Sequence, residues 1–165
     1  MMKKLIEGKE LKSVILNTLL RFDEFCKERD IKYTIAYGTA LGAIRHKGFI
    51  PWDDDLDFGF TRDNYEKFIA TAKKNLSSEF FLQTWDSDRE YGYAFPKIRK
   101  KGTISQERIA QDSDANCGIF IDLFPYDNLP NDKNKRRKLI TKLTFLKKLI
   151  INRGWKMKQL IVRDG

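Results

Sequence analysis

The sequence predicts one α+β domain, with a mixed β-sheet flanked by helices, and a basic helical extension after it. Segments with the apolar spacing of helices come first and last, and several short segments of β-strand character lie between them. Of the 165 residues, 41% are hydrophobic and 13% are aromatic, a composition that allows a buried core and argues against disorder.

The N-terminal part begins with an expected helix over residues 10–30, where apolar side chains recur at the i, i+3, i+4, i+7 spacing. Residues 31–37 then alternate, which predicts a strand whose end is marked by Gly38 and Thr39. A short helix is expected next, over residues 39–45.

A turn over residues 47–51 is expected to lead into a second strand, over residues 56–60. Asp63 is followed by Glu66 at the spacing of a capping box, so we expect Asp63 to be the N-cap of the next helix.

The middle of the chain predicts three further strands, over residues 80–85, 91–99 and 118–124. Pro96 lies inside the second of these, and proline cannot donate a ladder hydrogen bond, so we expect an edge position or a bulge there. Residues 110–117 are polar and predict a loop. Helical spacing returns over residues 132–152.

The basic charge is concentrated at the end of the chain. Residues 1–130 contain 20 Lys and Arg against 21 Asp and Glu, whereas residues 131–165 contain 12 against 2. Nucleic-acid-binding domains more often spread basic residues over the folded body, so no nucleic-acid partner is expected. We divide the chain into a domain over 1–130 and a basic amphipathic extension over 131–165, which packs on the domain or lies on an anionic membrane.

The cellular compartment is predicted from what the sequence lacks. Cys26 and Cys117 are too few and too widely spaced for a disulfide framework, so both are expected to be small core residues in a reducing compartment. Residues 1–12 carry charges without an apolar signal-peptide core, and no stretch approaches the roughly 18 apolar residues of a membrane span. A cytoplasmic protein is expected, with at most peripheral attachment to the inner face of the membrane.

Residues 53–57 place four carboxylates in five positions. Such charges repel one another, and a divalent cation compensates them best, because Mg²⁺ prefers hard oxygen ligands. Residues two apart in a strand share a face. Asp55 and Asp57 are therefore expected to point together, while Leu56 and Phe58 face the core.

Asp122 is the candidate for a third carboxylate. It lies inside the otherwise apolar strand predicted over residues 118–124, where an unpaired charge would be strongly unfavourable. A metal ion shared by Asp55, Asp57 and Asp122 would neutralise it, and we predict Mg²⁺ or Mn²⁺.

Phosphate binding is expected at the turn formed by Gly38 and Thr39. Glycine lets the backbone approach a ligand, and the N-terminus of the following helix attracts phosphate. Basic side chains that are candidates for the same role are Arg45, Lys47, Lys97 and Arg99. Lys97 and Arg99 are equally well interpreted as ordinary surface charges.

The order of these features resembles the nucleotidyltransferase superfamily that includes DNA polymerase β: Gly-Thr, then Asp-x-Asp, then a third Asp on a later strand. Residues 37–57, YGTALGAIRHKGFIPWDDDLD, resemble more closely the signature of the LicD family, whose relatives include the fukutin proteins. Segments that also resemble this family are 31–33, 62–65, 96–99 and 121–125. The resemblance covers about residues 12–153, and Ala40 departs from the usual leucine.

The LicD resemblance implies a polymerase β-like nucleotidyltransferase fold and a metal held by Asp55, Asp57 and Asp122. It further implies transfer of phosphocholine or a similar group from a CDP-linked donor such as CDP-choline. The acceptor would be a free or lipid-linked glycan of teichoic acid, capsule or lipooligosaccharide. It also implies that residues 131–165 begin a longer C-terminal part. A choline cargo would favour an aromatic cage, for which the candidates are Trp52, Trp85, Tyr91 and Tyr93.

Other functions stay open at this point. A glycosyltransferase also uses Asp-x-Asp, normally after a Rossmann-like half for which too few residues precede Asp53. A nucleotidyltransferase proper would share the core chemistry, and a non-enzymatic protein would use residues 131–165 to bind RNA or membrane. An EF-hand loop is excluded, because Phe58 would occupy its glycine position and Asn64 its bidentate glutamate position.

Overall fold

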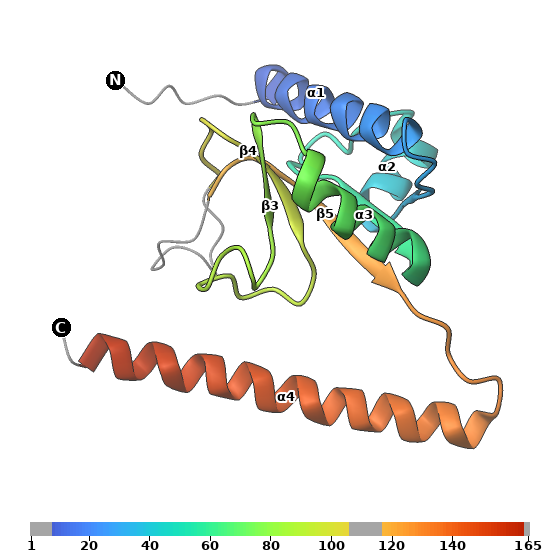
Figure 1. Ribbon diagram of the computed structural model, residues 1–165, viewed down its shortest axis with the longest axis vertical. Coiled ribbons are helices and arrows are strands. Elements are labelled where there is room, and N and C mark those ends of the chain that lie inside the picture. Colours follow the sequence, from blue (N-terminus) through green and yellow to red (C-terminus); the bar gives the residue numbers. More distant parts are fainter. Residues whose placement is uncertain (1–7, 106–116, 164–165) are drawn as a thin grey trace. The chain divides into compact units, whose positions relative to one another are not determined.

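The computed structural model describes residues 8–105 and 117–163, which form two compact units, Met1–Tyr126 and Asp127–Gly165. Figure 1 shows their helices and strands in chain order. The elements of the first unit are α1 (Gly8–Lys27), β1 (Thr34–Ile35), α2 (Tyr37–His46), β2 (Asp57–Thr61), α3 (Arg62–Asn75), β3 (Phe80–Gln83), β4 (Lys97–Lys100) and β5 (Phe120–Tyr126). The second unit contains α4 (Lys133–Arg163).

The strands of the first unit form one mixed sheet in the order β1-β2-β5-β4-β3. Strands β2 and β5 are parallel, and every other neighbouring pair is antiparallel. The predicted α+β class with a mixed sheet is therefore confirmed.

One face of the sheet is apolar and forms the core with α1 and α3. The helical spacing of α1 directs Phe22 into this core, where its ring lies 4.8 Å from that of Phe58 and 5.7 Å from that of Phe68. Burial of one such side chain contributes about 1.5–3 kcal/mol. The apolar strand residues of the core are Phe58, Phe60, Phe80, Leu82, Ile98, Ile121 and Leu123.

The opposite face carries a polar row that crosses four strands. Asp57 of β2 is paired with Asp122 of β5, Asp122 with Lys97 of β4, and Lys97 with Gln83 of β3. Residues in register on neighbouring strands project to the same side of a sheet. The fold therefore gathers residues that lie far apart in the sequence.

Two predictions for the N-terminal part are wrong in detail. The strand expected over 31–37 is reduced to β1. At its start, the Ile31 N–H donates a hydrogen bond to the Cys26 carbonyl (2.9 Å) and so belongs to the end of α1. At its end, Tyr37 already begins α2. The N-cap of α3 is Thr61, and Asp63 lies inside the first turn of the helix instead. The helix predicted over residues 10–30 is confirmed as α1.

Strand β4 corrects the expectation for Pro96. The strand begins directly after this proline and lies between β5 and β3, so it is internal and unbulged at this position. The Pro96 carbonyl accepts a hydrogen bond from the Leu123 N–H (3.1 Å), so the missing donor does not interrupt the ladder. Residues 91–96, expected to be part of this strand, form an irregular segment instead.

Helix α4 extends the helix predicted over residues 132–152. Asp132 precedes it and accepts a hydrogen bond from the Lys135 N–H (2.8 Å), as N-cap residues do. None of the helices in the described residues is both long and apolar enough to cross a membrane. The loop predicted over 110–117 falls outside the described residues except for Cys117, which is half-buried, whereas Cys26 is buried as expected.

Candidate metal and phosphate site

Three carboxylates from two neighbouring strands converge on the polar face of the sheet. Asp57 begins β2, Asp122 lies opposite it on the parallel strand β5, and Asp55 precedes Asp57 by two positions. Each offers one oxygen atom, and these three atoms all lie within 4.8 Å of one another. Asp122 is only 6% exposed. The structure thus brings together the three predicted ligands, which we call the carboxylate trio.

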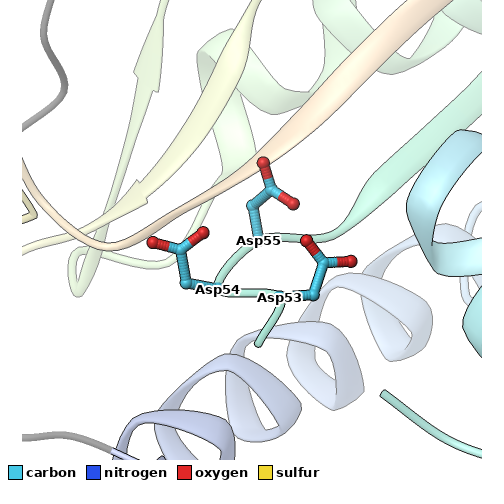
Figure 2. Close-up of side chains that lie close together, drawn as sticks. All are labelled: Asp53, Asp54 and Asp55. Atoms are coloured by element: carbon cyan, nitrogen blue, oxygen red, sulfur yellow. The ribbon is translucent and has the colours of Figure 1, made fainter. Parts of the chain in front are cut away.

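A second acidic group shares Asp55 with the trio. Asp53, Asp54 and Asp55 follow one another in the loop before β2, and each again offers an oxygen within 4.8 Å of the others. Figure 2 shows their side chains extending to the same side of this loop. Asp54 is exposed, whereas Asp53 and Asp55 are half-buried. Two overlapping groups are therefore candidates for holding metal.

The N-terminus of α2 faces the trio. The Gly38 N–H donates to Asp57 Oδ2 (3.3 Å), and Thr39 Oγ1 accepts from the Asp57 N–H (2.8 Å). A Cβ atom on Gly38 would lie 2.9 Å from Asp53 Oδ2, so glycine allows this carboxylate to approach the backbone. The positive end of the helix dipole consequently points at the acidic cluster, where it also favours bound phosphate.

Arg45 and Lys47 lie at the other end of α2. Arg45 lies seven positions after Gly38, which corresponds to about 10 Å along a helix axis. Lys47 is the C-cap, in the left-handed conformation with φ 56°, and its N–H donates to the Gly42 carbonyl. The structure therefore places Gly38 and Thr39 beside the trio but leaves the two basic residues at the far end of the helix.

Lys97 and Arg99 are buried, so their interpretation as surface charges is wrong. Each is 1% exposed, because both belong to an internal strand. Lys97 Nζ lies 2.9 Å from Asp122 Oδ1. Arg99 donates to Gln83 Oε1 (2.5 Å) and to the Gly118 carbonyl (2.8 Å). Arg99 thus joins strands together, whereas Lys97 contacts the trio itself.

The electrostatics of the trio favour a cation. Burial, followed by the charges of Asp57, Asp53, Asp122 and Asp54, raises the pKa of Asp55 to about 7. Burial also raises the pKa of Asp57, although the Gly38 hydrogen bond and Lys97 oppose this shift. Three ionised carboxylates and one lysine carry a net charge of −2, which one divalent cation would neutralise. The hard oxygen donors fit Mg²⁺ or Mn²⁺.

A pH-dependent effect of metal on stability follows from Asp55. Its pKa in the folded protein is raised from 3.8 to about 7, so the stability due to its protonated form is present below about pH 4 and lost as the pH rises through 7. We expect MnCl₂ to raise the melting temperature more at about pH 8 than at about pH 5. Differential scanning fluorimetry of the protein and of Asp55→Asn measures this difference. An equal gain at both pH values, or an unchanged pH dependence in Asp55→Asn, would contradict the prediction.

Comparisons with known proteins agree with this geometry. Residues 30–149 match the family model described as LicD/FKTN/FKRP, nucleotidyltransferase domain. The chain belongs to the LicD family. The matched residues contain the trio, the N-terminus of α2 and every strand that the structure describes, from β1 to β5.

Individual relatives support the same family. The chain is 36% identical over 132 residues to the lipopolysaccharide cholinephosphotransferase LicD of Haemophilus influenzae, a match that covers 79% of this chain and 48% of that protein. It thus spans about half the length of this curated relative. Two uncharacterized Rickettsia proteins match shorter stretches: RT0683 of Rickettsia typhi is 45% identical over 56 residues, and RP689 of Rickettsia prowazekii is 51% identical over 41 residues. These matches cover 18% and 15% of the two proteins.

Aromatic side chains beside the trio were not singled out from the sequence. The rings of Tyr37 and Phe95 lie 4.9 Å and 4.4 Å from that of Phe124. Tyr126 packs so closely on Gly59 that a Cβ atom there would lie 2.2 Å from its ring. The signal was present in β5, because Phe124 and Tyr126 follow Asp122 at alternate positions and so share its face of the sheet.

Proposed function

We propose that this domain transfers phosphocholine, or a similar phospho-substituent, from a CDP-linked donor to a cell-surface glycan. The observation that carries the proposal is the convergence of Asp55, Asp57 and Asp122 within 4.8 Å beside a helix N-terminus. The named activity of the Haemophilus influenzae relative supports phosphocholine as the group and lipopolysaccharide as an acceptor of this kind. Mg²⁺ or Mn²⁺ is part of the proposal, as is the CDP-linked donor.

The reaction would exchange one phosphorus–oxygen bond for another. The acceptor hydroxyl oxygen attacks the phosphorus that carries choline, the bond to the CMP oxygen breaks, and CMP leaves with the bonding electron pair. The hydroxyl proton passes to a carboxylate, for which Asp53 is a candidate because it lies at the same helix N-terminus without belonging to the trio. A metal ion held by the trio would stabilise the charge on the diphosphate.

The chain's own groups have separate parts in this scheme. The first turn of α2 would direct its N–H groups at a donor phosphate. Lys97 holds Asp122 through their ion pair and so positions one ligand of the trio. Arg45 and Lys47 have no part in the scheme, because they lie at the opposite end of α2.

Release of CMP tests the proposal. We expect the protein with MnCl₂ and a glycan acceptor to convert CDP-choline to CMP, as followed by ³¹P NMR, with chelator as the control. CDP-ribitol, UDP-glucose and ATP are compared under the same conditions. Turnover of UDP-glucose alone would identify a glycosyltransferase, and turnover of ATP alone a nucleotidyltransferase proper; either result would overturn the proposal.

The place of this chain in the cell stays a prediction. The net charge of +10 over residues 131–165 supports peripheral association with an anionic membrane, because lysine and arginine side chains are attracted to acidic lipid headgroups. Such association would bring the domain close to a lipid-linked acceptor at the cytoplasmic face.

A further inference from the structure

A pocket of about 270 Å³ lies beside the irregular segment that precedes β4. Its walls include five aromatic side chains, together with an acidic and a basic side chain, Asp86 and Lys73. The aromatic residues are Tyr65, Trp85, Tyr91, Tyr93 and Phe95. Three of them, Trp85, Tyr91 and Tyr93, come from the set that the sequence suggested for an aromatic cage. The fourth member of that set, Trp52, is not part of the pocket and is 81% exposed.

The pocket is connected to the carboxylate trio through Tyr93, which lines the pocket, and Lys97, which contacts Asp122. The ring centroid of Tyr93 lies 4.5 Å from Lys97 Nζ, and the same Nζ lies 2.9 Å from Asp122 Oδ1. The rings of Tyr91 and Phe95 lie 5.6 Å and 5.4 Å from that of Tyr93, so these three rings form one continuous part of the wall. A continuous chain of contacts through Tyr93 and Lys97 therefore leads from the wall of the pocket to Asp122.

The chemistry of the walls suits a cation. Aromatic faces carry negative electrostatic potential and attract ammonium groups, most strongly on tryptophan. The Trp85 side chain is accessible, because 57% of it is exposed. The protein already places its own cations against two of these rings, with Lys97 over Tyr93 and Arg62 5.2 Å from the centre of Tyr65.

The acidic side chain of the pocket is available to a ligand. Asp86 Oδ2 lies 3.3 Å from Lys73 Nζ, and both side chains are at least half exposed. Exposed ion pairs of this kind are weak, so a bound ammonium group can replace Lys73 as the partner of Asp86. A nucleobase would stack on the same aromatic walls, and an amino group on it would hydrogen-bond to Asp86, but a neutral base carries no positive charge for the rings and this carboxylate to attract.

We propose that this aromatic pocket binds the quaternary ammonium group of the transferred substituent, while the phosphate of the same group lies on the side of the trio. The inference rests on the proposed function, which supplies a substituent with a cation at one end and a phosphate at the other. Trp85 and Tyr93 then contact the ammonium group with their aromatic rings, and Asp86 neutralises its positive charge.

Binding of choline alone tests the pocket without any transfer. Titration of tryptophan fluorescence with choline, in the absence of metal, is expected to give a saturable change. The neutral isostere 3,3-dimethyl-1-butanol is expected to bind much more weakly, because it has the same shape without the charge. An equal response to both compounds would indicate apolar binding only, and a response to CMP without one to choline would indicate a nucleobase site. Either result would overturn the proposal.

Three variants locate the binding. Trp85→Leu is expected to weaken choline binding about threefold to tenfold, as measured by isothermal titration calorimetry. Trp52→Leu is the matched control, because it removes an exposed tryptophan outside the pocket, and it should bind choline like the unmodified protein. Lys73→Met is expected to strengthen binding, because it frees Asp86. Undiminished binding by Trp85→Leu would place choline elsewhere and overturn the assignment.

Failure of the pocket and failure of the proposed function are distinguishable. Choline binding that is lost in Trp85→Leu, without CMP release from CDP-choline, would support the pocket and contradict the transfer. CMP release without saturable choline binding would support the transfer and contradict the pocket. Asp57 does not line the pocket, so the Asp57→Asn variant is expected to bind choline like the unmodified protein.

Discussion

Asp57→Asn is expected to abolish tight binding of Mn²⁺ and to lower CMP release from CDP-choline by about 100- to 1000-fold. Asp57 begins β2, where its carboxylate accepts a hydrogen bond from the Gly38 N–H at the N-terminus of α2 and lies within 4.8 Å of the other two carboxylates of the trio. The amide of asparagine keeps the size of the side chain but removes the negative charge that would hold the ion. Calorimetric titration with MnCl₂ and the CMP assay measure the two effects separately.

Two further variants decide which acidic group holds the metal. Asp122→Asn should behave like Asp57→Asn, because both belong to the trio. Asp54→Asn is the matched control, since Asp54 is exposed and belongs only to the group of Asp53, Asp54 and Asp55. If Asp54→Asn abolished Mn²⁺ binding while Asp122→Asn did not, the ion would be held by the loop before β2 and not by the trio.

Lys97→Met is expected to lower the free energy of unfolding by about 3–5 kcal/mol, because it leaves the buried carboxylate of Asp122 without its cation. The two side chains are 1% and 9% exposed, and their charged atoms are 2.9 Å apart. Urea denaturation without metal measures the loss. Saturating MnCl₂ should recover part of it, since a divalent ion on the trio would supply the missing positive charge.

The exposed pair of Lys73 and Asp86 provides a control for this effect. Lys73→Met is expected to change the free energy of unfolding by less than about 1 kcal/mol, because exposed ion pairs contribute little. The double variant Lys97→Met/Asp122→Asn should be more stable than Lys97→Met, because it no longer buries an uncompensated charge. A cost for Lys97→Met no greater than that for Lys73→Met would show that Asp122 does not depend on its lysine.

Local patterns predicted the helices and the acidic cluster well. The spacing of apolar residues identified α1, and the unbroken run over residues 37–57 identified the family before the fold was known. The convergence of Asp55, Asp57 and Asp122 was also predictable. Strand alternation directs Asp55 and Asp57 to one side, and an acidic residue in an otherwise apolar strand requires a partner on a neighbouring element.

The neighbours of Lys97 in the chain, by contrast, could not show whether its side chain is exposed or buried. A lysine and an arginine two apart in a short strand are equally compatible with an exposed edge and with a buried centre. Only the strand order decided between them, because it places β4 between β5 and β3 and puts Lys97 directly opposite Asp122. The same strand order makes the strand that follows Pro96 an internal one, although the proline itself had predicted an edge position or a bulge.

The sequence by itself determined the class of the fold, the family and the identity of the acidic residues, because each depends on residue types at short and regular spacings. The tertiary structure alone decided which charges are buried, which end of α2 faces the carboxylates and which aromatic rings form one pocket. These features depend on contacts between segments that are distant in the sequence, such as residues 37–57, 91–97 and 122. Their pairing is set by the packing of the whole sheet, which no local pattern contains.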